Sequence, residues 1–312
     1  DVYKRQLGDR FRLDGWRLRA VQHTLDRLKE ERSPTPFSLH DEDHNRDLLA
    51  ALVALADVTE ETPIRLFSVR VFNDSKRFEA IQGAVVRLAR RHQPDWRELR
   101  SYEVLRELGL VANPNHLYLY GPWRLVDGRG LVHDLSDFEP SVGIPARLAA
   151  SVRQVTVGAG RVVCVENLAP FYELVRHERR GLAALYLGGN PSPACRHLLR
   201  CLAKATPPSV SLLLWADLDY GGLNILAQLR RLVSPRFAPY RMDAETLDAH
   251  VLWARPLTPS DERRLTRLAR HPYLADLRPF IQHLLARGLK LEQEAVTLAT
   301  GQPLLGSVAP YS

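Results

Sequence analysis

Short apolar runs alternate with amphipathic stretches through the middle of the chain. The nearly continuous apolar runs, typical of strands buried on both faces of a sheet, cover residues 161–167, 181–187 and 211–216. The segments after them, with apolar residues at helical spacing, cover residues 171–180, 193–205 and 223–232. This alternation predicts an open α/β fold with a parallel sheet, whose right-handed crossovers bring the strand ends to one edge.

Acidic residues stand at the ends of two of these apolar runs. Glu166 lies at the end of the first run, and Asp217 and Asp219 follow the third. Residues two apart in an extended chain point to the same side, so the two aspartates can share one divalent cation, and oxygen ligands suit Mg²⁺. Gly221 and Gly222 allow a tight turn into a helix whose N-terminus suits a phosphate. On this stretch alone, the aspartates could equally be caps of that helix.

The segment before the sheet has a different pattern. Residues 64–72 alternate enough to predict a half-buried strand, and helices are expected over 76–92 and 95–108. Residues 117–126 alternate like a hairpin around Gly121 and Pro122. Helix, turn, helix and hairpin is the plan of a winged helix, which predicts DNA binding through the second helix. A small structural α+β module is the alternative.

Helical patterns also occupy the two ends of the chain. Helices are expected over 19–31 and 45–56, and the stretch His40 to His44 is best interpreted as the cap of the second helix, not as a metal site. Near the other end, helices are expected from 258, over 276–287 and from Lys290. Glu292 and Glu294 of the last helix either complement its dipole or act as outer partners of a metal.

Met242 is the single methionine of the sequence, so residue 1 is not a translation start. We expect a fragment, a processed form or a foreign leader over residues 1–6. The expected domain ranges are an N-terminal helical segment at 1–62, truncated relative to a full-length protein, a winged helix at 63–150 and an α/β catalytic domain at 151–312.

Composition favours a globular protein with a polyanionic partner. The 312 residues include 43 Lys and Arg against 36 Asp and Glu, which gives a net charge of +7. No apolar run approaches the ~20 residues of a membrane span, so we expect a cytoplasmic protein. The cysteines are too few and scattered for a disulfide framework, and Cys195, His197 and Cys201 do not have a recognised zinc spacing.

The acids and a glycine turn carry a resemblance to a known domain. Glu166, the turn Gly188-Gly189-Asn190-Pro191 and the pair Asp217 and Asp219 occur in the order, and after the strands, that are found in the Toprim domain. This domain is the acid-bearing module of topoisomerases, primases and some DNA nucleases. The resemblance implies a Mg²⁺- or Mn²⁺-dependent site in which all three acids are metal ligands and catalytic residues.

A winged helix (CAP-like) followed by a Toprim domain resembles the A subunit of type IIB topoisomerases and the related meiotic break-forming enzyme. Within that group, residues 68–79 and 291–295 are most similar to the nuclease subunit of Wadjet plasmid-defence systems, over a match from Leu66 to Ala299. That family implies a homodimer acting on double-stranded DNA beside an SMC-type, condensin-like complex in plasmid or phage defence, without a membrane partner.

The predicted function is therefore metal-dependent endonucleolytic cleavage of duplex DNA. Candidate DNA-binding residues are the cations of the predicted winged helix, namely Lys76, Arg77, Arg91, Arg97 and Arg100. One alternative is a topoisomerase-like transesterase with a tyrosine nucleophile, but the type IIB family carries a Tyr-Tyr pair, and here Tyr102 stands alone. Another alternative is a non-catalytic DNA-binding subunit.

Overall fold

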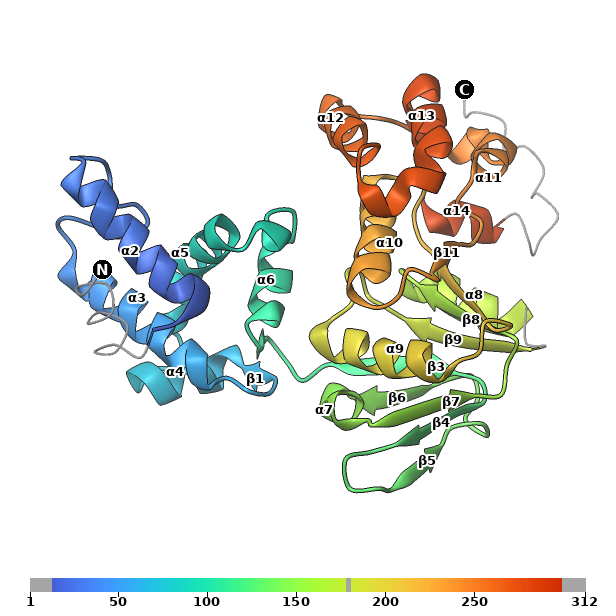
Figure 1. Ribbon diagram of the computed structural model, residues 1–312, viewed down its shortest axis with the longest axis horizontal. Helices are drawn as coiled ribbons and strands as arrows, with labels where there is room; N and C mark the ends of the chain where they lie inside the picture. The colour runs from blue at the N-terminus through green and yellow to red at the C-terminus, as the bar shows by residue number, and fades with distance from the viewer. Residues whose placement is uncertain (1–12, 178–180, 299–312) are drawn as a thin grey trace, which may run out of the picture. The chain divides into compact units, whose positions relative to one another are not determined.

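The computed structural model describes residues 13–177 and 181–298 (Figure 1). The expected leader over residues 1–6, the end of the helix expected at 171–180 and the last position of the family match, Ala299, lie outside the described residues. The chain divides into two compact units, one up to Asn115 and one from His116 onward. The expected domain ranges 1–62, 63–150 and 151–312 do not coincide with these units. The structure has the mixed α/β architecture that the sequence predicts.

The first unit is mainly helical and has its own apolar core. Its helices are α2 (Gly15–Lys29), α3 (Glu42–Ala54), α4 (Ile64–Phe72), α5 (Arg77–His92) and α6 (Ser101–Glu107), with short 3₁₀ turns η1 (Leu55–Asp57) and η2 (Pro94–Trp96). Two short parallel strands, β1 (Thr62–Pro63) and β2 (Leu110–Val111), pair beside them. Phe67 and Phe78 are fully buried and meet edge to face, with ring centroids 5.1 Å apart, which fixes α4 against α5.

The strand expected over residues 64–72 is wrong, because this segment is helix α4. Phe67 and Ser68 are buried, whereas Leu66 and Val69 are exposed by 52% and 44%. The buried face therefore follows the helical period and not the alternation that β-branched residues suggested. Asn73, with φ 55°, ends the helix in the left-handed conformation that Asn tolerates.

The helix expected over residues 95–108 is divided, and this corrects the placement of two arginines. The segment begins with η2, and α6 starts only at Ser101 because the Glu103 carboxylate accepts a 2.6 Å hydrogen bond from the N–H of Arg100. Arg97 follows η2 and Arg100 caps α6, so neither lies within that helix.

The second unit is built on a six-stranded mixed sheet in the order β11-β10-β8-β9-β3-β6. Its strands are β3 (His116–Tyr120), β6 (Val142–Pro145), β8 (Arg161–Val165), β9 (Leu182–Tyr186), β10 (Ser211–Trp215) and β11 (Ala238–Pro239). Strands β11, β10, β8 and β9 are parallel, and β3 pairs antiparallel with β9 and β6. The predicted parallel core, with its three expected strands, is confirmed.

The expected hairpin over residues 117–126 is wrong. Strand β3 pairs with β9 and β6, whereas β4 (Trp123–Val126) pairs with β5 (Val132–Asp134) and β7 (Gln154–Val157) in a separate antiparallel sheet. Gly121, with φ 96°, turns the chain between them, and a Cβ there would stand 2.5 Å from the carbonyl oxygen of Leu182. The chain therefore passes close to β9 at this turn and continues into the separate antiparallel sheet, so β4 does not pair with β3.

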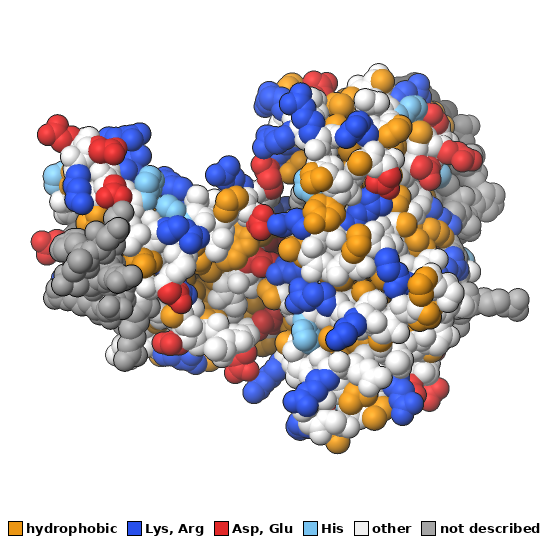
Figure 2. Space-filling view, viewed as in Figure 1, with side chains coloured by type: hydrophobic (Ala, Val, Ile, Leu, Met, Phe, Trp, Pro, Cys, Tyr) orange, Lys and Arg blue, Asp and Glu red, His pale blue; other side chains and the backbone are white. Residues whose placement is uncertain are grey.

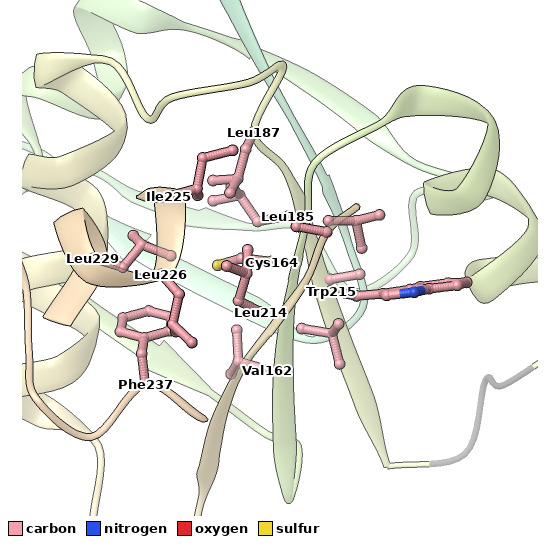
Figure 3. Packing of buried hydrophobic residues seen from close by; sticks show 14 of the residues in the cluster. Val162, Cys164, Leu185, Leu187, Leu214, Trp215, Ile225, Leu226, Leu229 and Phe237 are labelled. Carbon is pink, nitrogen blue, oxygen red and sulfur yellow. The ribbon is translucent and has the colours of Figure 1, made fainter. Parts of the chain in front are cut away.

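Helices cover both faces of the parallel strands. They are α8 (Leu168–His177), α9 (Pro193–Ala205) and α10 (Tyr220–Leu232), whereas α7 (Ala146–Ser151) packs beside α9, β3 and β6. Figure 3 shows Leu226 of α10 and Phe237 beside Cys164 and Leu214 on one face, while the indole of Trp215 lies on the other. Because successive strand residues alternate between faces, apolar residues at nearly every position are needed to bury both.

The remaining elements complete the second unit beyond the sheet. They are α11 (Ala244–Ala249), η3 (Val251–Trp253), β12 (Arg255–Pro256), α12 (Pro259–Leu268), η4 (Pro272–Leu277), α13 (Arg278–Arg287), β13 (Leu289–Lys290) and α14 (Gln293–Leu298). The helix expected from Lys290 begins only at Gln293, because Leu289 and Lys290 pair with β12 and Leu291 bridges to Leu218. Every helix of residues 13–177 and 181–298 is too short or too polar to cross a membrane.

Candidate active site

The candidate acids come together at the carboxyl edge of the parallel strands. Glu166 directly follows β8, and Asp217 and Asp219 follow the neighbouring strand β10. The Glu166 carboxylate accepts a 3.2 Å hydrogen bond from the N–H of Asp217 through Oε2. The N–H of Glu166 in turn donates to the carbonyl of Trp215 at 3.0 Å. The two strand ends are therefore held in register at the point where the acids emerge, as the sequence predicts for an open α/β sheet.

Asp217 is held by groups from two other segments. Its Oδ1 accepts hydrogen bonds from the N–H of Gln293 at 2.7 Å and from Nδ2 of Asn167 at 3.2 Å. Among the described residues, its Oδ2 accepts no hydrogen bond, so one carboxylate oxygen is left for a ligand. The orientation of Asp217 thus depends on the start of α14 and on the residue after Glu166.

Gln293 links these segments although its side chain is completely buried. Its Nε2 donates to the carbonyl of Trp215 at 3.0 Å, and its Oε1 accepts from the N–H of Asn167 at 3.1 Å. Both polar ends of the buried amide are therefore satisfied. Neither Gln293 nor Asn167 was predicted to be a site residue. Adjacency to the named acids was the only signal in the sequence for either residue.

Asp219 caps helix α10, as the simpler interpretation of the sequence proposed. Its Oδ1 accepts a 3.0 Å hydrogen bond from the N–H of Gly222. A Cβ on Gly222 would stand 2.1 Å from the carbonyl oxygen of Asp217, so only glycine fits at this approach of the helix to the strand end. A capping role does not exclude metal binding, because a carboxylate has a second oxygen.

Burial and neighbouring acids make this edge unfavourable for ionised carboxylates. Burial, and then the charges of Asp219, Glu294 and Glu292, raise the pKa of Asp217 to about 7, although the Gln293 N–H acts in the opposite direction. Burial also raises the pKa of Asp219, where the charge of Lys290 lowers it and that of Asp261 raises it. Strongly perturbed carboxyl groups at a sheet edge are typical of functional sites.

Glu292 and Glu294, the suggested outer acids, lie beside Asp217 and are exposed. Glu292 precedes α14 and pairs with Arg255 at 2.7 Å, and Glu294 accepts a 3.5 Å hydrogen bond from Nδ2 of Asn167. Their nearness to Asp217 agrees with the suggestion of outer metal partners, and Glu294 in the first turn of α14 also agrees with the helix-dipole interpretation.

The donor set suits a hard divalent cation, although the described residues do not form a complete ligand shell. Within residues 13–177 and 181–298, no group of three or more His, Cys, Asp and Glu side chains is placed to hold a metal ion. Mg²⁺ commonly keeps several waters and is bound through one or two carboxylates. Clustered acids with raised pKa values and an open oxygen on Asp217 fit such a water-rich site.

The other cysteine, histidine and acid clusters of the sequence have structural roles. Asp41 caps α3 by accepting a 2.8 Å hydrogen bond from the N–H of His44, which confirms the cap interpretation. His197 contacts the carbonyl of Val152 at 2.7 Å and lies 3.7 Å from the thiol of Cys201. These contacts join α9 to the segment before β7.

The predicted DNA-binding cations all lie in the first unit and are exposed. Arg77 pairs with Asp47, and Arg91 donates to the carbonyl of Thr35 at 3.0 Å.

Two comparisons with known proteins identify the family. The sequence model described as "Wadjet protein JetD, C-terminal" matches residues 130–303, which is more than half of the chain. The chain is also 25% identical over 280 residues to Wadjet protein JetD of Bacillus cereus (strain Q1), a match that covers 89% of this chain and 67% of the relative. The matched family segment contains Glu166, Asp217 and Asp219 together with the strands that position them. The chain belongs to the JetD family.

Proposed function

We propose that this protein is the metal-dependent DNA endonuclease of a Wadjet-type plasmid-defence system. The observation that carries the proposal is the convergence of Glu166, Asp217 and Asp219 at one sheet edge in a member of the JetD family. The parallel strands β9, β8 and β10, with acids after two of them, support a Toprim assignment for the second unit.

In this proposal, Asp217 and Asp219 hold Mg²⁺ or Mn²⁺, with Glu166 as a further ligand or as a general acid or base. The bound cation would neutralise charge on a phosphodiester and promote ionisation of a water. Asn167 and the N–H of Gln293 orient Asp217 through its Oδ1 and keep Oδ2 available. The fixed contact between Glu166 and the N–H of Asp217 keeps the general acid or base beside the ligands.

Duplex DNA is the proposed substrate, bound partly through a winged-helix-like first unit. Helices α4, α5 and α6 support this assignment, although the strands expected for the wing belong to the second unit. Exposed Lys76, Arg77, Arg91, Arg97 and Arg100 would contact phosphates without reading sequence.

A cleavage assay tests the proposal. Supercoiled and linear plasmid DNA are incubated with the full chain in Mg²⁺, Mn²⁺ or a chelator, alone and with a Wadjet condensin-like complex. We expect metal-dependent cleavage that falls by about 10²–10⁴-fold in Glu166→Ala. Asp217→Ala should lose activity at least as severely. The matched control is Glu173→Ala, which removes a half-buried acid of α8 that pairs with Arg176 and His177. Metal-dependent DNA binding without cleavage by any combination would favour a non-catalytic subunit.

Tyr102 separates hydrolysis from the transesterase alternative. This tyrosine lies on α6 and is 50% exposed, and it has no neighbouring tyrosine in the sequence. Tyr102→Phe should keep most of the activity, because the attacking oxygen comes from water in a hydrolytic site. Recovery of DNA covalently attached to Tyr102 after denaturation would instead establish a topoisomerase-like reaction.

Cutting both strands also suggests assembly of two chains on DNA. Four apolar residues near the end of the sequence, Tyr273, Leu274, Leu277 and Phe280, suggest either an interface or core. Leu274 and Phe280 are buried in the core of the second unit, so Tyr273 and Leu277 are the members accessible to a second chain. Light scattering with and without duplex DNA should give a dimer mass on DNA. A monomer mass at every protein concentration tested would contradict the dimer.

A further inference from the structure

Helix α12 carries arginines beside the acid site that the proposed function does not use. Arg263 and Arg267 are four residues apart on the helix, and Arg270 follows one turn later. The i, i+4 spacing places Arg263 and Arg267 along one side of α12, Arg270 lies in the turn just after the helix, and all three are exposed. Figure 2 shows Lys and Arg side chains gathered over the part of the second unit where Figure 1 places α12.

The first turn of α12 adjoins the acid site. Asp261 caps the helix with Thr258 and pairs with Lys290 at 2.8 Å, and its charge contributes to the raised pKa of Asp219. One turn further, the guanidinium of Arg264 lies over the ring of Tyr220, 4.8 Å from its centroid. Tyr220 directly follows Asp219, so the first turns of α12 lie beside the segment that carries this acid.

The second unit also contains arginines that have a structural role, because they bind groups on other elements of the fold. Arg230 forms a bidentate pair with Asp276, at 2.6 and 2.8 Å, and Arg236 donates to the carbonyls of Thr206, Pro207 and Val210. Such contacts join elements of the fold. By contrast, neither Arg263 nor Arg270 has an acidic partner among the described residues, so their guanidinium groups remain available to an external anion.

We propose that Arg263, Arg267 and Arg270 form a docking surface for the phosphate backbone of duplex DNA on the catalytic unit itself. The proposal rests on the proposed nuclease function, and it adds a contact surface to the cations predicted in the first unit. Arg264, on the adjoining side of α12, contacts Tyr220 next to Asp219.

The dimensions and chemistry of the row fit a phosphate backbone. A helix rises 1.5 Å per residue, so Arg263 and Arg267 are separated by about 6 Å along its axis, and one DNA strand carries a phosphate about every 3.4 Å of duplex axis. The row therefore spans two or more phosphates. Arginine suits this role because its planar guanidinium binds phosphate oxygens in pairs. The acid site itself repels the backbone, so adjacent cations are needed to hold a strand there.

The test measures the salt dependence of binding. The full chain is titrated into a fluorescein-labelled 30-base-pair duplex of mixed sequence, in chelator, at several NaCl concentrations. The variants are Arg263→Ala/Arg267→Ala/Arg270→Ala and the charge-preserving triple lysine. The matched control, Arg124→Ala/Arg153→Ala, removes two exposed arginines of the second unit. Arg124 lies in β4, and Arg153 directly precedes β7. Thermal unfolding of each variant is recorded alongside.

In the triple alanine variant, the negative slope of log affinity against log salt should become flatter by about 2–3, since each phosphate contact contributes about 0.9 to its magnitude. The lysine variant should retain most of the slope, and the control should match the wild type. Cleavage in Mg²⁺ at moderate salt should fall in parallel with binding. Equal slopes for a folded triple alanine variant and the wild type would overturn this proposal while leaving the nuclease function intact.

Two further outcomes separate this proposal from the function on which it rests. Suppose that the wild type cleaves the duplex and that the triple alanine variant loses cleavage but binds the duplex with unchanged affinity. This result would overturn docking by this surface. Wild-type protein that neither binds nor cleaves the duplex contradicts both proposals. If the triple alanine variant lowers the affinity for single-stranded DNA of equal length but leaves the affinity for the duplex unchanged, the assignment of this surface to duplex DNA is also overturned.

Discussion

Asp217 combines burial with several like charges, and this combination makes its ionisation costly in the metal-free protein. Its pKa is raised to about 7 from an ordinary value of 3.8, mainly by burial. Between these two pH values the folded state binds a proton that the unfolded state lacks. The free energy of unfolding contributed by Asp217 therefore decreases as the pH rises from about 4 to about 7, and the loss is complete above the folded-state pKa.

Asp217→Asn should remove this penalty. At pH 8 in chelator, the variant should be more stable than the wild type by up to about 4 kcal/mol, which corresponds to about 3 pKa units at 1.36 kcal/mol each. At pH 4 the difference should vanish. Urea unfolding across this range measures it, with Asp57→Asn, an exposed position in η1, as the control. A constant difference between wild type and Asp217→Asn at all pH values would contradict the raised pKa. Added Mg²⁺ should reverse the ranking at pH 8, because it stabilises only the carboxylate.

Gln293 is the residue whose loss should disturb Asp217 without removing any acid. Gln293→Leu leaves the carbonyl of Trp215 and the N–H of Asn167 without this side-chain partner, and an unsatisfied buried group costs about 1–3 kcal/mol. We expect a loss of stability in this range together with weaker metal binding. Gln282→Leu, on an exposed position of α13, is the matched control. Metal-induced stabilisation equal to that of the wild type in Gln293→Leu would show that Gln293 does not position the site.

At the scale of elements, the turn from β10 into α10 determines where the aspartates stand. Gly222→Ala would place a Cβ 2.1 Å from the carbonyl oxygen of Asp217, which the backbone can relieve only by moving α10 away from the strand end. We expect a destabilisation of about 2–4 kcal/mol and loss of cleavage. Gly83→Ala in α5 is the matched control, since its Cβ would meet only the end of the Arg87 side chain at 3.8 Å.

The control should be neutral or more stable by up to about 1 kcal/mol, because alanine favours the helix. Chemical denaturation of both variants measures the contrast. If Gly222→Ala were as stable and as active as Gly83→Ala, the close approach of α10 to Asp217 would not matter for the site.

Elements whose burial is uniform could be predicted from the sequence, and those whose burial depends on tertiary neighbours could not. Strands β8, β9 and β10 are apolar on both faces, so their pattern has only one satisfactory arrangement. Residues 64–72 mix β-branched and charged residues, and only contact with α5 reveals that Phe67 and Ser68 share the buried face. The strand pairing of residues 117–126 could not be predicted either, because β3 pairs with β6 and β9, whose residues are 23 or more positions away in the sequence.

The same distinction applies to the site. Glu166, Asp217 and Asp219 could be chosen because each follows a recognisable strand, and strand ends have a fixed geometry. Gln293 and Asn167 could not be chosen, since their importance arises from hydrogen bonds between segments that are far apart in sequence. Polar residues next to predicted acids are ordinary in loops, so their sequence signal is weak.

At the scale of the whole molecule, residues 13–177 and 181–298 form two apolar cores that share no residue. One core is formed by the helices of the first unit, and the other surrounds the parallel sheet and includes the elements that hold the acids. The acids, their hydrogen-bond partners and the arginine row of α12 all belong to the second unit. The proposed division of work is therefore that the second unit binds metal and cleaves, whereas the first increases affinity for the duplex.

Separating the units tests this division. A protein of residues 116–312 should unfold cooperatively and keep its Mg²⁺-induced rise in melting temperature, because the hydrogen bonds of Asp217 with Glu166, Asn167 and Gln293 lie within it. Its duplex affinity should be lower, and its salt slope smaller, than those of the full chain, since Lys76, Arg77, Arg91, Arg97 and Arg100 are removed. Binding with the full-chain slope would show that the first unit contributes no phosphate contacts. A folded fragment without any response to Mg²⁺ or Mn²⁺ would show that the metal site requires the first unit as well.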